Sequence, residues 1–334
     1  MPEKSPLKEA QEKFVQAIPA AHLAQEDCPT SLALNRIATT AIIAPIDSPP
    51  YSRAIVEGFL VRSEDTATAT ESSPAVFRIN GSVMPGDTSC PAPEQGQAIE
   101  VATGSLVPAG NYSIVRMWEA KRNGDSITAE RPFEAGFFIE AQGCDIAKNS
   151  TIIEAGQLIS VEDIGLLASL GVDSLSVRKQ PEITLFASGN EVIELGTDFR
   201  AGAIFDCNTP MLSAAIKQAG GIAISGGIMK DDFDIFLLAL KSALEESDMV
   251  VISGGTAVGG RDFVSDLIRE TGDLIVDGVP MKSGRPLIMG IANNKPIVCV
   301  AGHPPEALRG FRLFGVAAIN QLTGRQAPLP EEGR

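Results

Sequence analysis

Histidine and cysteine are scarce in this sequence, and long apolar runs are missing from it. The two histidines, His22 and His303, are too few for a three-histidine zinc site. The five cysteines are odd in number, far apart and nowhere spaced C-x-x-C, which argues against a disulfide framework or a zinc knuckle. We therefore expect a reducing, cytoplasmic location, and we expect oxygen ligands for any bound metal.

Membrane and nucleic-acid signals are also lacking. No stretch reaches the roughly 18 apolar residues of a membrane-spanning helix, and the first residues, Met1 to Lys13, are too charged and polar for a signal peptide. The 27 Lys and Arg residues are outnumbered by 42 Asp and Glu residues, which gives a net charge of −15. A chain of this charge has no general electrostatic attraction for nucleic acid. Neither a membrane nor a nucleic acid is an expected partner.

The N-terminal half of the chain carries helical and β-type patterns. Its 334 residues, 44% of them hydrophobic, are enough for about two globular domains. Apolar residues four apart after a Ser-Pro pair predict a helix over Ser5–Ile18. Prolines within residues 45–50 mark a boundary, and short β-prone runs from Ala54 to Phe138 predict a small all-β module. Ser160 is a suitable N-cap for a helix over Val161–Leu170.

Buried-type strands alternate with amphipathic helices from Glu182 onward. Strands are expected at Ile183–Ala187, Ile222–Ser225, Met249–Ser253, Leu287–Ile291 and Ile297–Val300, and helices at Pro210–Ala219, Asp231–Glu246 and Phe263–Glu270. This alternation predicts an α/β fold with a parallel sheet and helices on both faces. Ligands bind such sheets outside the carboxyl ends of the strands, so the residues that follow each strand are the candidates for a site.

Two of these strand-end segments are glycine-rich turns, Ser188–Glu191 and Ser253–Asp262. The second has four glycines in seven residues before a helix, which would let backbone N–H groups approach a phosphate. It matches neither the dinucleotide fingerprint nor the Walker A pattern. Because glycine also serves ordinary tight turns, the residues alone leave both interpretations open.

The other two segments carry cations and a histidine. Lys282 and Arg285 flank Gly284 before a strand and form either an anion clamp or a solvated loop. His303 lies in Ala301–Pro305, at the start of the last helix, where it is more typical of a helix cap or a packing residue than of a catalytic triad.

Together these segments resemble, in order and spacing, the signatures of the molybdopterin molybdenumtransferase family, which comprises MoeA and the C-terminal domain of gephyrin. The family patterns S-T-G-D-E-L, D-x-N, S-G-G-V-S-V-G-x-x-D, K-P-G-K-P and P-G-N-P stand here as Ala187–Val192, Asp206–Asn208, Ser253–Asp262, Lys282–Pro286 and Gly302–Pro304. Two upstream patterns, G-x-D-I and T-G-A-x-x-P, stand as Gly143–Ile146 and Thr103–Pro108. The similarity extends roughly from Leu7 to Leu322.

The resemblance implies a homodimer of three-domain chains. Residues 1–46 and 138–178 would form an elongated linker and dimerisation domain, residues 47–137 an inserted β-rich domain, and residues 179–324 a three-layer molybdopterin-binding α/β domain with a parallel sheet. Family members usually carry a further C-terminal β-barrel. Because the chain ends about ten residues after its last expected helix, we expect this domain to be missing.

The resemblance also implies a reaction. The family inserts molybdate into the dithiolene of adenylated molybdopterin (molybdopterin-AMP), with Mg²⁺ assisting and AMP released, and other proteins of molybdenum cofactor biosynthesis are the implied partners. Such a site needs backbone N–H groups and cations for phosphates, and carboxylates for a hard divalent metal. The implied catalytic residues are Glu57, Asp145, Glu191, Asp231 and Asp262, of which Glu191 and Asp262 would bind the metal. The implied cofactor-binding residues are Ser188, Gly189, Asn208, Ser253, Gly254, Gly255, Lys282, Gly284, Arg285, Gly302 and Pro304.

Several positions depart from the family patterns. The block P-P-F-D-N-S-A-M-D-G-Y-A stands here as Pro49–Leu60, in which Glu57 replaces an aspartate. Asn190 replaces an acid, Ser283 replaces a proline, and residues 301–304 lack the leading proline and the asparagine. Two interpretations follow: an active transferase without the barrel domain, or a catalytically impaired member that binds molybdopterin or has a regulatory role without inserting metal.

Overall fold

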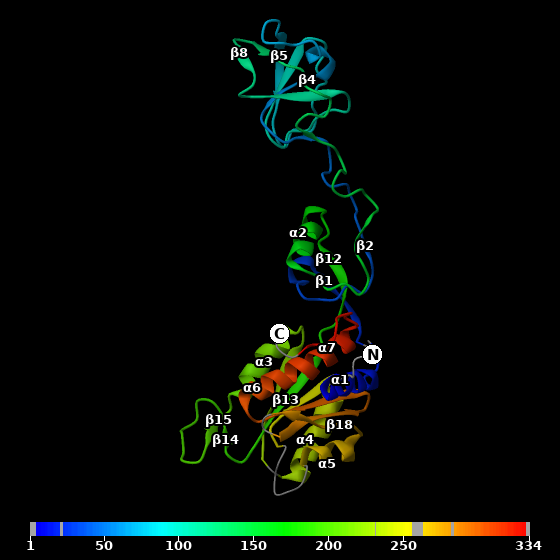
Figure 1. Ribbon diagram of the computed structural model, residues 1–334, viewed down its shortest axis with the longest axis vertical. Coiled ribbons are helices and arrows are strands. Elements are labelled where there is room, and N and C mark those ends of the chain that lie inside the picture. The colour runs from blue at the N-terminus through cyan, green and yellow to red at the C-terminus, as the bar shows by residue number, and fades with distance from the viewer. Residues whose placement is uncertain (1–4, 21–22, 231, 256–262, 282–283, 332–334) are drawn as a thin grey trace. The chain divides into compact units, whose positions relative to one another are not determined.

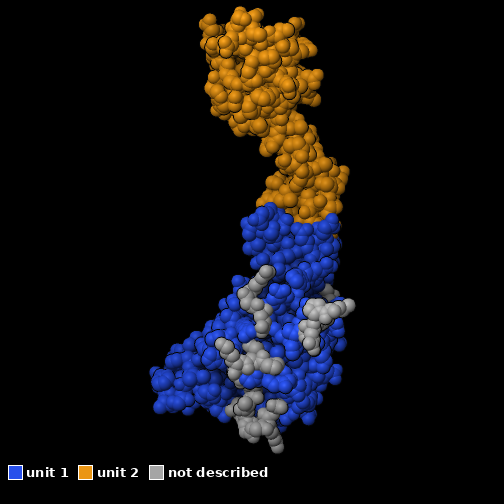
Figure 2. Space-filling view, in the orientation of Figure 1, with its two compact units in different colours: residues 1–40, 154–164, 174–334 blue, residues 41–153, 165–173 orange. Residues whose placement is uncertain are grey.

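The structure, a computed structural model, describes residues 5–20, 23–230, 232–255, 263–281 and 284–331 (Figure 1). The chain divides into two compact units (Figure 2). Unit 1 comprises residues 1–40, 154–164 and 174–334, and unit 2 comprises residues 41–153 and 165–173. The expected three-domain division differs from this grouping and stays a prediction. No helix in the described ranges is both long enough and apolar enough to cross a membrane.

Unit 1 is built on a six-stranded sheet with the strand order β16-β13-β17-β20-β19-β18. In that order the strands are Ile222–Met229, Glu182–Ser188, Met249–Ser253, Lys295–Val300, Gly284–Ala292 and Asp273–Met281. The first four run parallel to one another. β17 is buried along its whole length and β13 from its second residue onward. Such near-continuous apolar runs are what strands covered on both faces require.

The expectation of a parallel sheet is confirmed for these four strands but not at one edge, where β19 is antiparallel to both β20 and β18. β19 and β20 are joined by Asn293 and Asn294, both with positive φ (50° and 63°), and Ala292 pairs with Lys295. A two-residue connection can only join antiparallel strands, because a parallel pair needs a crossover of a dozen or more residues. The α/β fold class is otherwise confirmed.

Helices cover both faces of this sheet (Figure 1). α1 (Pro6–Ala17), α3 (Asn208–Gln218), α6 (Pro304–Gly310) and α7 (Val316–Thr323) pack on one face, and α4 (Phe233–Glu246) and α5 (Phe263–Thr271) pack on the other. The predicted N-terminal helix is confirmed: Ser5 caps α1, and Phe14 is fully buried in the core of the sheet. α6 continues through a π-helical turn, Phe311–Gly315, into α7.

Short elements complete unit 1. β1 (Gln25–Pro29) pairs with β12 (Ser174–Arg178), β14 (Val192–Ile193) pairs with β15 (Ile204–Phe205), and Thr30–Leu32 forms a 3₁₀ turn. The helix predicted after Ser160 is also confirmed as α2 (Val161–Ser169), which begins in unit 1 and ends in unit 2. The Ser160 hydroxyl accepts from the Asp163 N–H at 3.1 Å, while the Asp163 carboxylate accepts from the Ser160 N–H at 2.8 Å. This reciprocal capping box explains where α2 begins.

Unit 2 contains the predicted β-rich segment, a mixed six-stranded sheet with the order β7-β4-β6-β5-β9-β8. In that order the strands are Tyr112–Arg116, Gly58–Arg62, Gln97–Val101, Ala75–Val83, Ser126–Ala129 and Lys121–Asn123. Two short pairs, β3 (Arg53–Ala54) with β10 (Ile139–Glu140) and β2 (Ile42–Ile43) with β11 (Thr151–Ile153), and a 3₁₀ turn at Ser63–Thr66 complete the unit. Phe59 and Leu60 lie in two different apolar clusters, because successive side chains of β4 point to opposite faces.

Candidate functional site

A cavity of about 310 Å³ lies at the carboxyl ends of three neighbouring parallel strands of unit 1. β13 ends at Ser188 and β17 at Ser253, and Gly302 follows β20 by two residues. The lining, which we call the strand-end pocket, is Ala187, Ser188, Glu191, Val192, Ile204, Phe205, Asp206, Cys207, Asn208, Ser253, Gly302, His303 and Pro304. It includes six of the predicted site residues, so the sheet brings these six together at the edge where ligands bind parallel sheets.

Asn208 joins two of these strand ends. Its side-chain amide donates to the Ser253 hydroxyl at 2.8 Å and to the Gly302 carbonyl at 2.7 Å, and the Ser253 hydroxyl donates to the Ala301 carbonyl at 3.4 Å. Asn208 and Ser253 are only 8% and 3% exposed. Asn208 is also the first residue of α3, so the same residue places a helix N-terminus, with its partial positive charge, beside the pocket.

The glycines after β17 allow this strand to end close to β13. Gly254 and Gly255 have φ values of 91° and 73°, which side-chain-bearing residues rarely adopt. A Cβ on Gly254 would lie 2.7 Å from the Ser188 carbonyl oxygen, and one on Gly255 would lie 2.9 Å from the Ser188 hydroxyl oxygen. The close approach to β13 therefore requires glycine at both positions, whatever ligand binds.

Ser188 and Glu191 present oxygen atoms to the pocket. The Ser188 hydroxyl is buried and makes no hydrogen bond with any described residue, which is a costly state for a hydroxyl and one that a ligand can relieve. The exposed Glu191 carboxylate lies over Gly189, since a Cβ there would be 2.9 Å from both of its oxygens. A hydroxyl and a carboxylate in one pocket form an oxygen donor set of the kind that Mg²⁺ prefers.

The charged side chains that line the pocket, among the described residues, are acidic. Glu191 and Asp206 line it, whereas no lysine or arginine among the described residues does. The Asp206 carboxylate accepts from the Thr209 N–H at 3.0 Å and so helps to cap α3. His303 is exposed at the N-terminus of α6 and makes no side-chain capping bond. The partial positive charge of the α3 N-terminus is therefore set against two acidic side chains.

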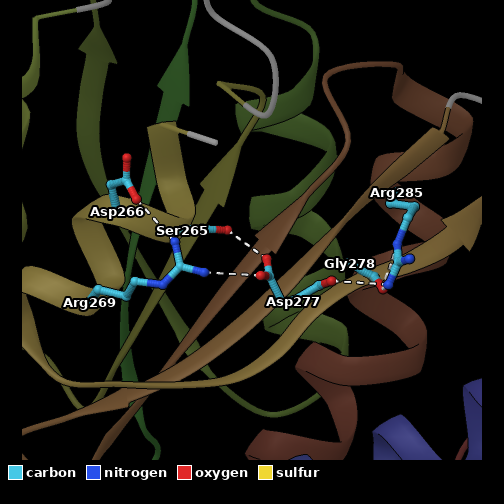
Figure 3. Close-up of polar contacts among 6 residues, drawn as sticks. All are labelled: Ser265, Asp266, Arg269, Asp277, Gly278 and Arg285. Atoms are coloured by element: carbon cyan, nitrogen blue, oxygen red, sulfur yellow. Dashed lines mark hydrogen bonds and ion pairs between the residues drawn. The ribbon is translucent and has the colours of Figure 1, made fainter. Parts of the chain in front are cut away.

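Three of the predicted residues, Asp231, Asp262 and Lys282, lie outside the described residues. Gly284 and Arg285 open β19 and do not line the strand-end pocket. Figure 3 shows the Arg285 guanidinium folded onto β18, where it donates to the Gly278 carbonyl at 2.7 Å and the Asp277 carbonyl at 3.1 Å. The Asp277 carboxylate is held in turn by the Ser265 hydroxyl and by Arg269. Arg285 therefore contacts backbone carbonyls in this structure.

Glu57 and Asp145 both belong to unit 2. Glu57 is exposed, and its carboxylate accepts from the Thr103 hydroxyl at 3.2 Å. Thr103 is not among the site residues that the resemblance implies, although it is the first residue of the Thr103–Pro108 family motif.

Asp145 is exposed near Cys144 and Glu140, with potential ligand atoms of the three within 4.8 Å of one another. Glu140 also pairs with Arg53 at 2.5 Å.

Two family models together match most of the chain. Residues 5–171 match the MoeA N-terminal region (domain I and II), and residues 185–321 match the probable molybdopterin binding domain. The chain belongs to the MoeA family. This confirms the resemblance seen in the motifs, and the protein accordingly functions in molybdenum cofactor biosynthesis.

Individual relatives agree with the MoeA assignment. A Methanocaldococcus jannaschii protein named for molybdopterin biosynthesis is 31% identical over 290 residues, covering 84% of this chain and 71% of the relative. The molybdopterin molybdenumtransferase of Staphylococcus aureus is 26% identical over 333 residues, covering 98% and 78%. The crystal structure of a MoeA protein from Pyrococcus horikoshii OT3 matches with a TM-score of 0.81 and 27% identity, covering 97% and 80%.

Proposed function

We propose that this MoeA-family protein inserts molybdate into the dithiolene of adenylated molybdopterin and releases AMP. The observation that carries the proposal is the strand-end pocket, in which residues of four separate family segments meet and three of these segments are joined by the Asn208 amide. The pocket lies within residues 185–321, the part that matches the probable molybdopterin binding domain. An impaired, purely binding member is the less favoured alternative, because relatives covering nearly the whole chain are named as transferases.

The chain's own groups have distinct tasks in this proposal. The N-terminus of α3 and the Gly255 N–H would hold phosphate oxygens, whereas the Gly254 N–H already donates to the Val300 carbonyl at 3.0 Å. The Ser188 hydroxyl would gain the hydrogen bond it lacks among the described residues. Glu191, with Asp262, would hold Mg²⁺, which supplies positive charge that neutralises the phosphates and the leaving AMP. Lys282 is the proposed cationic partner of the ligand. To contact the ligand as a second cation, Arg285 would first have to release the carbonyls of Asp277 and Gly278.

The acids of unit 2 complete the proposed chemistry. We infer that Glu57 and Asp145 orient molybdate, and that Thr103 fixes the Glu57 carboxylate through its hydroxyl. We also infer a homodimer that works in the cytoplasm, in which the β-rich module of one protomer serves the α/β domain of its partner. Sedimentation of the purified protein would measure whether it is a dimer.

The test of the proposal is an insertion assay with purified protein, adenylated molybdopterin, molybdate and Mg²⁺. The parent should form molybdenum cofactor, and Glu57→Gln should lower the rate at least about tenfold, because a lost charge contact in the reaction is worth more than about 1.4 kcal/mol. Glu71→Gln, which neutralises an exposed acid of the same unit, is the matched control and should react at the parent rate. Equal rates for the parent and Glu57→Gln would remove Glu57 from the reaction.

A further inference from the structure

The single tryptophan of the chain lies exposed in unit 2. Trp118 follows β7 by two residues and is 63% exposed, although tryptophan is on average a highly buried residue. A large, rigid aromatic side chain left in solvent supplies stacking area at low entropic cost, which is typical of ligand-binding surfaces.

One face of the Trp118 ring is already covered. The Arg116 guanidinium carbon lies 4.9 Å from the centroid of Trp118 and 4.7 Å from that of Phe138, so the guanidinium contacts both rings. Arg116 is itself held in place, because its Nε donates to the Glu119 carboxylate at 2.7 Å. The other oxygen of Glu119 accepts from Arg131 at 2.7 Å. A fixed guanidinium holds the indole in one orientation, so little rotamer entropy would be lost when a ligand stacks on it.

Trp118 also follows directly, in the chain, a residue that contacts Glu57. Gly58 of β4 pairs with Arg116 of β7 on one side and with Val101 of β6 on the other, so β4 begins where its two neighbours end. The residues just beyond these ends are therefore neighbours: the Met117 N–H donates to the Glu57 carbonyl at 3.2 Å, and the Thr103 hydroxyl donates to the Glu57 carboxylate at 3.2 Å.

We propose that the open face of Trp118 stacks on a planar heteroaromatic ring of adenylated molybdopterin and so positions that substrate beside Glu57. The inference rests on the proposed function, because that substrate carries two such rings, the pterin and the adenine. Stacking on an aromatic side chain suits either ring, since every such ring has a π-face. Ring stacking, which the pterin and the adenine can both undergo, is thus assigned to Trp118. The experiment decides which of the two rings stacks.

Tryptophan fluorescence tests the proposal without any need for turnover, because Trp118 is the only tryptophan. The full-length protein with Mg²⁺ is titrated separately with AMP, with a soluble pterin and with ribose 5-phosphate, which lacks a base. We expect saturable quenching by AMP or by the pterin, whichever ring stacks, and none by ribose 5-phosphate. Val76→Ala removes another exposed apolar side chain of unit 2 and should quench as the parent does. Absence of saturable quenching by both ring compounds would overturn the proposal.

Variants of Trp118 separate stacking from a general structural role. Trp118→Leu should raise the calorimetric Kd of the quenching compound, and the KM for adenylated molybdopterin, by about tenfold with kcat nearly unchanged, whereas Trp118→Phe should stay within about threefold of the parent. A Leu variant that binds as tightly as the parent would contradict the proposal while leaving the transferase function intact. Saturable quenching in a parent that inserts no molybdate would support Trp118 while contradicting the proposed function.

Discussion

The side-chain amide nitrogen of Asn208 lies 2.8 Å from the hydroxyl oxygen of Ser253, and the two residues are 45 positions apart in the chain. With its second bond, to the Gly302 carbonyl, Asn208 connects the start of α3 to the ends of β17 and β20. The shape of the strand-end pocket therefore depends on one buried amide.

Replacing Asn208 with leucine should destabilise unit 1. Both hydrogen bonds would be lost while the Gly302 carbonyl stays beside an apolar side chain, which costs roughly 1–3 kcal/mol of unfolding free energy. Asn80→Leu is a matched control, since the Asn80 amide also donates to a side chain, Gln97, but on the surface; its cost should be below about 1 kcal/mol. Urea unfolding followed by circular dichroism measures both. Equal midpoints for the two variants would show that the Asn208 bridge adds no stability.

Gly255→Val should abolish ligand binding at the strand-end pocket. Position 255 has a φ of 73°, and a Cβ there would lie 2.9 Å from the Ser188 hydroxyl, so the branched side chain must displace the end of β13 or the turn itself. Calorimetry with adenylated molybdopterin measures the loss. Gly124→Ala places a Cβ at a similar positive φ where nothing lies within 4 Å; it tests backbone strain alone and should bind normally. Unchanged affinity in folded Gly255→Val would remove the turn from the site.

Ligand binding should protect Cys207 from alkylation. Cys207 is exposed and lines the strand-end pocket, whereas Cys299 is fully buried and burial raises the pKa of its thiol to about 12, so that it stays unreactive. At a concentration of adenylated molybdopterin ten times the Kd, the alkylation of Cys207 should slow about tenfold. Peptide mass spectrometry over a time course measures the rate at each cysteine. In Gly255→Val the protection should disappear, and equal rates with and without ligand in the parent would place the ligand elsewhere.

The stability of unit 2 should depend on the ionisation of Glu119. Hydrogen bonds from Arg116, and then from Arg131, hold the pKa of this carboxyl well below its usual range, at about 2. A lowered pKa stabilises the folded state above the unfolded-state value of about 4.3, and this contribution is lost as the pH falls toward 2. The parent should therefore exceed Glu119→Gln in stability at pH 7, and the difference should shrink between about pH 4.3 and pH 2. Denaturation followed by the fluorescence of Trp118, which lies in the same unit, measures this. A difference that stays constant over that range would refute the role of the ion pairs.

Much of the α/β unit could be predicted because its signals are local. The buried strands β13 and β17 are unbroken apolar runs, and the capping residues Ser5 and Ser160 mark helix starts in the sequence itself. The sequence does not predict β18, because Asp273, Asp277 and Gly278 interrupt its apolar pattern, and it does not single out the paired asparagines before β20 as a hairpin turn.

For the site, too, the sequence predicts which residues take part but not which of them contact one another. The rule that ligands bind beyond the carboxyl ends of strands correctly selects Ser188, Asn208 and Ser253. The contacts among them depend on β13, β17 and β20 being neighbours, which no local pattern specifies. The contact of Arg285 with Gly278 could not be predicted without β18. Likewise, the bond from Thr103 to Glu57 joins two motifs 46 residues apart.

The most direct test of the account is the dependence of AMP release on molybdate. Purified protein is given adenylated molybdopterin and Mg²⁺, with and without molybdate, and AMP and molybdenum-loaded cofactor are quantified in the same sample. For the proposed transferase, molybdate should stimulate AMP release, and AMP and loaded cofactor should appear in equal amounts. Binding of adenylated molybdopterin without AMP release, or AMP release without incorporation of molybdenum, would contradict it.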